Sequence, residues 1–374
     1  MEHSCQATER MRQSWRAPRQ SALPSSASGA SSDWPRLSPR IALTRRADMQ
    51  DGFGAQLHRT LAVYCLCKEL GFEYVHTPMV DISNQGLVAL EQNCHTSEYV
   101  ERCNALACLP HSADIRTLSS TERDQWSLIE QDLTVDELLR LKQATRSSNV
   151  LVRFPCLRPP FAADLQPSMY AHARGLLAEG LCAIAHQARM CGLPGTITIG
   201  VHVRRGDYAI GFSHRLLPPS YYLALCERVA AICERHGLPF VCELYTEALD
   251  KATVITPQHP GMRGRLRASV QLPADAHELA EYGRLPNLRC HVNEAPLVTF
   301  TRMVRADVLI ASRSGFSMCA HYVKRDGLTI FPSEWQGYRD DDGVAFDAPD
   351  VDARVEAAVL KAASHGSRDR SSDL

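Results

Sequence analysis

Apolar and polar positions alternate most regularly in the second half of the chain, where short apolar runs are separated by longer amphipathic segments. The short runs have the length of buried strands, and the segments between them place apolar residues at helical spacing. Strands are predicted at 196–204, 239–245, 288–292, 308–311 and 328–331, and helices at 219–235, 296–305 and 316–324. Strands and helices in this order predict a parallel sheet covered on both faces.

The first half of the chain has fewer clear patterns. A helix is predicted at 56–70 after a glycine-rich turn, a strand at 72–76, and a long helix over 167–192. Residues 134–144 show a capping threonine, early acids and a late lysine, which together indicate a further helix. Residues 81–130 are polar and weakly patterned, so loops and short helices are expected there.

Both ends of the chain lack a regular pattern. Residues 1–48 are rich in Ser, Arg, Pro and Ala and are predicted to be disordered, although this composition also suits a transit peptide or an incomplete start. Residues 366–374 are predicted to form a disordered tail. Between the ends, the Leu-Pro-Gly-Thr segment near residue 194 resembles a linker, so we expect an N-terminal lobe at 49–193 and a C-terminal lobe at 194–365.

Composition narrows the possible functions. The chain has 374 residues, of which 41 are Lys or Arg and 42 are Asp or Glu, giving a net charge of -1. This balance argues against nucleic acid as a partner, and any bound phosphate has to be held by local groups. No apolar stretch approaches the roughly 18–20 residues of a membrane span. The 14 cysteines include no Cys-x-x-Cys pair, which argues against structural zinc.

Polar clusters follow three of the predicted strands. Ligands of parallel sheets bind beyond the carboxyl ends of the strands, so these clusters are expected to converge on one rim. The clusters are His202, Arg204, Arg205 and Asp207; Thr246 and Glu247; and Ser312, Ser314, Gly315, Phe316 and Ser317.

The first cluster lies in the segment IGVHVRRGDY. Alternate residues of a strand point to opposite faces, so His202 and Arg204 share a face and Arg205 lies opposite. One arginine would bind a phosphate in bidentate fashion, and Asp207 would brace the other. The alternative is purely structural: Asp207 pairs with an arginine, and His202 is a core histidine.

Two turns that each open a helix are candidate anion sites. In ADVLIASRSGFS, the serines would add hydroxyl donors to the free N–H groups of the helix, and Gly315 would permit close backbone approach. Alternatively, Ser314 only caps the helix. The turn DGFGAQ, with Gly52, Phe53, Gly54 and Gln56, has the same design in the first half of the chain. Two helix N-termini that can bind anions, together with an arginine, are the groups expected at a diphosphate-binding site.

Four segments carry a resemblance to a known family. HVRRGD has the form of the His-x-Arg-Arg-x-Asp signature of GDP-fucose-dependent fucosyltransferases, which include α1,2-, α1,6- and protein O-fucosyltransferases. GFGAQLHRTLAVYC, VCELYTEAL and ADVLIASRSGFS are similar to other segments of these enzymes and follow in the same order, covering about residues 50–332. Several motifs in order are more specific than one.

The resemblance implies an α/β fold of the GT-B type, with two Rossmann-like lobes and parallel sheets. It implies inverting, metal-independent transfer of fucose from GDP-fucose to a glycan or glycoprotein acceptor, with no cofactor. Arg204 would stabilise the departing diphosphate, His202 would contact the nucleotide, and Arg205 and Asp207 would brace the loop. The helix entrances at Ser314 and at 52–54 would complete the phosphate cradle. The family would also place the protein in the Golgi or secretory pathway, but no signal or anchor is visible, so localisation stays open.

The sequence also departs from this family. The α1,6 enzymes carry a glutamate shortly after the signature, and YAIGFSHRLLPP contains no acid, which leaves His214, Glu247 and Glu294 as candidate bases. Thr299 stands where those enzymes place an aspartate toward guanine, so base selectivity and linkage are open. The alternative function is a catalytically inactive nucleotide-sugar- or phosphate-binding protein of the same fold.

Overall fold

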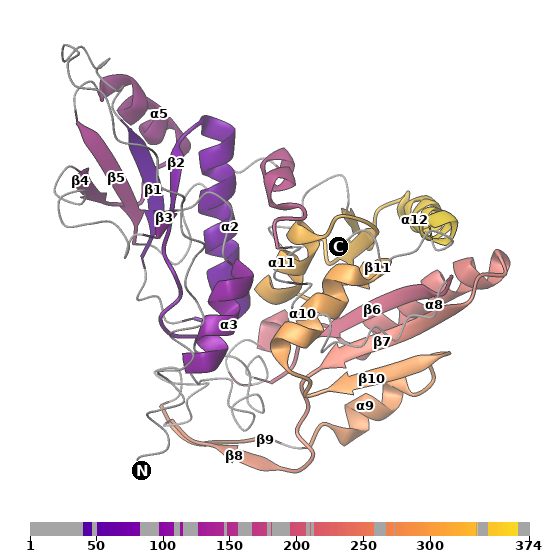
Figure 1. The fold of residues 1–374 in the computed structure, drawn as a ribbon. Helices are drawn as coiled ribbons and strands as arrows, with labels where there is room; N and C mark the ends of the chain where they lie inside the picture. Colours follow the sequence, from indigo (N-terminus) through magenta and orange to yellow (C-terminus); the bar gives the residue numbers. More distant parts are fainter. Residues whose placement is uncertain are drawn as a thin grey trace, which may run out of the picture. The chain divides into compact units, whose positions relative to one another are not determined.

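The computed structural model describes most of the chain from Arg40 onward, within one compact unit that spans residues 39–374. The described residues are 40–46, 51–82, 97–107, 113–114, 126–145, 148–155, 167–177, 181, 195–206, 210, 213–257, 267–272, 274–333, 335 and 343–365. They form two main parallel sheets, one from each half of the chain (Figure 1). None of the helices in these ranges has the length and apolar character needed to cross a membrane.

The first sheet has five strands in the order β3-β2-β1-β5-β4, and all its pairings are parallel. Its strands are β1 Ile41–Arg45, β2 Glu73–His76, β3 Ala113–Asp114, β4 Trp126–Glu130 and β5 Asn149–Phe154. β1 is the central strand, and all five of its residues are buried. The prediction that residues 1–48 lie outside the fold is therefore wrong for residues 41–45. This run is only five residues long and directly precedes a basic stretch, so it has no recognisable period of its own.

The helices with described bounds in the N-terminal half are α2 Phe53–Leu70, α3 Ser97–Ala107, α5 Val135–Ala144 and the 3-10 helix η2 Pro167–Ala173. α2 begins three residues before its predicted start and ends at Gly71, whose φ of 66° is the left-handed conformation that glycine favours. α5 begins with the predicted cap, a reciprocal pair of bonds between Thr134 and Glu137. The predicted long helix over 167–192 is wrong for its first part, where the structure has η2 at Pro167–Ala173 and a turn at 174–177; residues 178–180 and 182–192 lie outside the described residues, and residue 181 is helical.

The second sheet has six strands in the order β10-β7-β6-β11-β12-β13, again all parallel. Its strands are β6 Ile197–Val203, β7 Phe240–Thr246, β10 Leu288–Val292, β11 Val308–Ile310, β12 Leu328–Phe331 and β13 Gly343–Ala345. β6 is central, and the strand order reverses between β7 on one side and β11 on the other. Such a reversal opens a crevice at the carboxyl ends of the strands.

The helices of the C-terminal half are α8 Pro219–Arg235, α9 Ala276–Tyr282, α10 Pro296–Arg305, α11 Gly315–Val323 and α12 Val351–His365, with a 3-10 turn η3 at Ser213–Arg215. A two-stranded antiparallel ribbon, β8 Thr253–Ile255 and β9 Val270–Leu272, lies outside the main sheet. The predicted elements of this half are therefore confirmed to within one residue at each end.

The two faces of the second sheet belong to different hydrophobic cores. Ile199 and Val201 of β6 pack in one core with residues of α8 and α12. The other core joins α10 and α11 to α2 and to the first sheet, and it includes Leu309 of β11. α11 therefore packs between the second sheet and α2. The predicted lobe boundary at residue 193 falls outside the described residues and stays a prediction.

Candidate functional site

The carboxyl end of β6 carries the predicted signature at the centre of the second sheet. His202 is the last but one residue of the strand, Arg204 and Arg205 follow it, and Gly206 turns the chain at a φ of 63°. Asp207 lies outside the described residues, so its predicted brace is not described. The central position of β6 places this segment at the crevice that the strand order predicts.

His202 is held in the interior as a neutral ring. Its Nδ1 lies 2.9 Å from Ser312 Oγ, its ring lies 5.7 Å from that of Phe316, and only 5% of the residue is exposed. Burial, reinforced by the charge of Arg204, lowers the pKa of His202 to about 3. The bond to Ser312 therefore links the signature to the serine-rich turn, and contact of His202 with a nucleotide stays a prediction.

The two arginines differ in burial. Arg205 is buried, and its charge counteracts the burial that raises the pKa of Tyr222 of α8. Arg204 is half-buried, its charge lowers the pKa of His202, and its backbone bonds to the Tyr222 hydroxyl. That one arginine is structural and the other binds a ligand stays a prediction.

The end of β7 is fastened to the end of β6. Thr246 Oγ1 donates to the carbonyl of Val203 (2.9 Å) and to that of Glu247 (3.2 Å), so its hydroxyl is used within the protein. The Glu247 carboxylate lies directly against Gly206, where any Cβ would collide with it. Of the two residues predicted here, Glu247 reaches the loop of the signature, and Thr246 holds the two strands together.

The serine-rich turn is a closed network of buried hydroxyls. Ser314 caps α11 by accepting from the N–H of Phe316 (3.2 Å), and Ser317 donates to the carbonyls of Ser312 and Ser314 at 3.3 Å. All three serines are at most 3% exposed. Capping, the structural alternative for Ser314, is therefore present. The hydroxyls of Ser314 and Ser317 bond within the turn and that of Ser312 bonds to His202, so all three are used within the protein, and binding of an anion by this turn stays a prediction.

The glycine-rich turn and the serine-rich turn meet. A Cβ on Gly54 would lie 2.6 Å from the backbone N and Cα of Phe316, and Cys319 Sγ donates to the Gly54 carbonyl at 3.1 Å. Phe53 contacts the rings of Phe300 and Phe316 edge-on, with centroids 5.7 and 6.3 Å apart. The N-termini of α2 and α11 therefore lie against each other. Gly54 is the glycine that this approach requires, because a Cβ on Gly315 would meet only ordinary contacts of 3.8 Å or more.

Gln56 supports the glycine-rich turn from within. It is fully buried, and its Nε2 donates to the carbonyls of Asp51 (3.0 Å) and Asp81 (2.6 Å). Direct contact of Gln56 with a donor stays a prediction. Its bonds show that it fixes the loop that carries Gly52.

Two arginines near this turn were not predicted. Arg45 ends β1, and Arg59 binds the Asp51 carboxylate at 2.6 Å from α2. Burial, together with the charge of Arg59, lowers the pKa of Arg45 to about 10. Nε and Nη2 of Arg45 are buried and have no hydrogen-bond partner among the described residues. The sequence did hold a signal, since LTRR ends a strand with two arginines just as HVRR does.

The three candidate bases differ in their surroundings. Glu294 accepts from Arg302 Nε at 3.2 Å and from Thr299 Oγ1 at 3.3 Å. Burial alone would raise the pKa of Glu294, but its bonds from His291 and Thr299 and the charge of Arg302 bring it below the usual value. His214 is exposed in η3. Glu247 is the candidate that lies against the signature loop. Across the described ranges, no three His, Cys, Asp or Glu residues are grouped to hold a metal ion.

Comparison with known proteins gives structural similarity alone. No protein-family model matches the chain, and no curated protein matches it significantly. A NodZ α-1,6-fucosyltransferase soaked with GDP-fucose is similar over 76% of this chain and 92% of its own, at 14% identity and a TM-score of 0.33. POFUT1 in complex with GDP is similar over 79% and 99%, at 11% identity and a TM-score of 0.40. A family 9 glycosyl transferase from Veillonella parvula is similar over 88% and 97%, at 12% identity and a TM-score of 0.36. Similarity at this level assigns neither an activity nor a substrate to this chain.

Proposed function

We propose that this chain is a glycosyltransferase that transfers fucose from GDP-fucose to a glycan or glycoprotein acceptor, with inversion and without a metal ion. The observation that carries the proposal is the contact between the N-termini of α2 and α11, together with the His202 ring, which lies 5.7 Å from that of Phe316 and whose pKa the charge of Arg204 lowers. Each helix N-terminus has a partial positive charge of roughly half a unit, and two of them in contact repel each other unless an anion lies nearby. A diphosphate supplies that anion.

The chemistry of transfer agrees with this arrangement. The acceptor hydroxyl attacks the anomeric carbon, the bond from that carbon to the β-phosphate oxygen breaks, and GDP leaves with the bonding electrons. Negative charge therefore develops on the leaving oxygen, where Arg204 and the helix N–H groups stabilise it. A single displacement of this kind inverts the anomeric centre.

The acceptor proton needs a base. We assign it to Glu247, because its carboxylate lies against Gly206 in the loop that begins with Arg204. Glu294 is less suited, because its carboxylate is bonded to Arg302 and its pKa is lowered. Replacement of Glu247 by glutamine removes the base and keeps the shape of the side chain.

Donor binding is tested by thermal stability with GDP, GDP-fucose, UDP or ADP, in the presence of EDTA. We expect a rise in Tm with GDP and GDP-fucose that Arg204→Ala abolishes. Arg235→Ala is the matched control. It also removes an arginine, but one at the C-terminal end of α8, where Arg235 pairs with Glu356. If none of the four nucleotides changes the Tm, the proposal is refuted.

The alternative function, a nucleotide-sugar-binding protein without activity, is separated by turnover. Formation of GDP from GDP-fucose reports bond cleavage by the wild-type chain, whether fucose passes to water or to an acceptor. If GDP raises the Tm and no GDP is formed from GDP-fucose, either without acceptor or with a mixture of glycan acceptors, the inactive alternative holds. If the chain is active, Glu247→Gln is expected to reduce transfer by about 10²-fold or more while the GDP-induced shift persists.

A further inference from the structure

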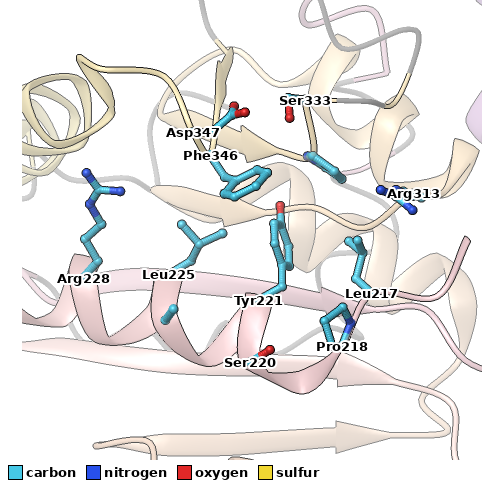
Figure 2. Close-up of a pocket in the computed structure, with 12 residues that line it drawn as sticks. Leu217, Pro218, Ser220, Tyr221, Leu225, Arg228, Arg313, Ser333, Phe346 and Asp347 are labelled. Carbon is cyan, nitrogen blue, oxygen red and sulfur yellow. The ribbon is translucent and has the colours of Figure 1, made fainter.

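A pocket of about 530 Å³ lies on the α8 side of the second sheet (Figure 2). Its walls come from the first turns of α8, from Arg313 in the serine-rich turn, and from the residues that follow β12 and β13. Pockets for small ligands usually measure about 300–1,000 Å³, so this one has the size of a binding site. None of the roles proposed above uses it.

An aromatic pair forms one wall of the pocket. The rings of Tyr221 and Phe346 meet edge-on at 5.3 Å and 79°, and Leu217 and Leu225 line the pocket beside them (Figure 2). Tyr221 Oη donates to the Ala311 carbonyl at 3.4 Å, which fixes its ring. Phe346 is 36% exposed, so part of its apolar ring is open to a ligand.

The polar groups of the pocket carry charges of both signs. Arg228 pairs with Asp352 of α12, and Arg313 Nη1 donates to the His214 carbonyl at 3.2 Å. The exposed carboxylate of Asp347 faces the same space (Figure 2). Since cations and carboxylates nearly balance, the pocket suits a ligand with hydroxyl groups rather than an anion. It differs in this respect from the rim at Arg204, where two helix N-termini and an arginine gather.

The pocket and the donor rim share one turn. The side chains of Ser312 and Ser314 bond within the turn around His202 and α11, whereas Arg313 between them lines the pocket. A ligand in the pocket would therefore contact the same turn that forms part of the predicted phosphate cradle, and a reaction of two substrates needs both of them held close together.

We propose that the pocket binds a neutral pyranose ring of the saccharide acceptor, an assignment that rests on the proposed glycosyl transfer. Pyranoses combine an apolar C–H face, which suits the open ring of Phe346, with hydroxyl groups, which suit Asp347 and Arg313. Asp347 accepts hydrogen bonds from hydroxyls of the sugar, and Arg313 donates to their oxygens.

The test is saturation-transfer NMR with four neutral probes: the methyl β-pyranosides of glucose, galactose, mannose and N-acetylglucosamine. We expect at least one to bind the wild-type chain, and Phe346→Ala and Asp347→Asn to weaken that binding by about five- to tenfold, as loss of one contact predicts. Leu360→Ala is the matched control, because it removes an exposed apolar side chain from α12 and is expected to leave binding unchanged. The Tm shift with GDP is measured on every variant.

The outcomes separate this proposal from the glycosyl transfer on which it rests. The pyranose proposal is overturned if no pyranoside binds or if all variants bind the pyranosides equally. If no pyranoside binds and Phe346→Ala also abolishes the GDP-induced rise in Tm, the pocket binds the nucleotide instead. If pyranoside binding depends on Phe346 and Asp347 but GDP gives no shift, the saccharide site stands and the proposed fucosyl transfer fails. If pyranoside binding depends on Phe346 and Asp347 and the GDP-induced rise in Tm depends on Arg204, both proposals are supported.

Discussion

Substitution of Gly54 by alanine tests the contact between α2 and α11. Gly54 lies in the first turn of α2 with ordinary helical dihedrals, so helix propensity alone predicts that alanine is favourable there. The added Cβ, however, would lie 2.6 Å from both N and Cα of Phe316. Both atoms are backbone, so no flexible side chain can move aside, and the two helix ends have to separate.

The gain in helix propensity and the cost of overpacking together determine whether Gly54→Ala stabilises or destabilises the protein. Replacing a helical glycine by alanine stabilises by up to about 1 kcal/mol. Overpacking of a well-packed interior costs about 1–3 kcal/mol, and backbone atoms on both sides place this site toward the upper end. We therefore expect a net destabilisation of about 1–2 kcal/mol, and a Tm lower by roughly 2–4 °C per kcal/mol.

Gly315→Ala is the matched control, because its Cβ would meet nothing closer than 3.8 Å and it also lies in a first helical turn. Calorimetry of the three proteins at one pH gives the comparison. We expect Gly315→Ala to equal or exceed the wild-type Tm and Gly54→Ala to fall below it. Equal or higher stability of Gly54→Ala would refute the close approach of the two helices.

Two further predictions concern the β6 end. Gly206→Ala is expected to destabilise by up to about 1 kcal/mol more than Gly237→Ala in urea titration, because both have a φ of 63° but only at Gly206 does the new Cβ displace the flexible end of Glu247. A Gly206→Ala protein more stable than Gly237→Ala would contradict this expectation. His202 has its pKa lowered from 6.5 to about 3, so between these values the unfolded chain binds a proton that the folded chain does not, and stability falls as the pH drops through this window, by about 1.4 kcal/mol per unit. Urea titrations at pH 7.5 and 5.5 should show a smaller loss for His202→Asn, and identical losses would count against the neutral, buried ring.

Five of the six strands of the second sheet were predictable because each of them carries its own signal, whereas β8, β9, α9, β13 and α12 were not predicted. Short apolar runs that helices cover on both faces form the strands β6, β7, β11 and β12. Turn residues precede and follow each run. Since the carboxyl ends of parallel strands share one edge, the convergence of the polar clusters followed from the strand order alone. The link between His202 and Ser312 is a consequence of that order.

Two strands of the first sheet that were missed, β1 and β4, depend on partners far away in sequence. β1 is five residues long and is a strand because β2 and β5 pair with it on either side. β4 has three exposed positions among its five, and its apolar pattern is too weak to distinguish it from a loop. Tertiary pairing, rather than local propensity, determines both of these strands. Arg45 was missed for the same reason, since its place at a rim follows only from the existence of β1.

Position 299 shows why the site could not be carried over residue by residue. From the sequence, Thr299 replaces an acid of the resembled enzymes and leaves that position without a carboxylate. In the fold, Thr299 Oγ1 donates to the Glu294 carboxylate at 3.3 Å, and Arg302 holds the same carboxylate from the next turn of α10. A negative charge is therefore present beside position 299, supplied by a residue that precedes the helix. The charge around position 299 therefore depends on a side chain earlier in the chain, and the letter at position 299 does not contain that information.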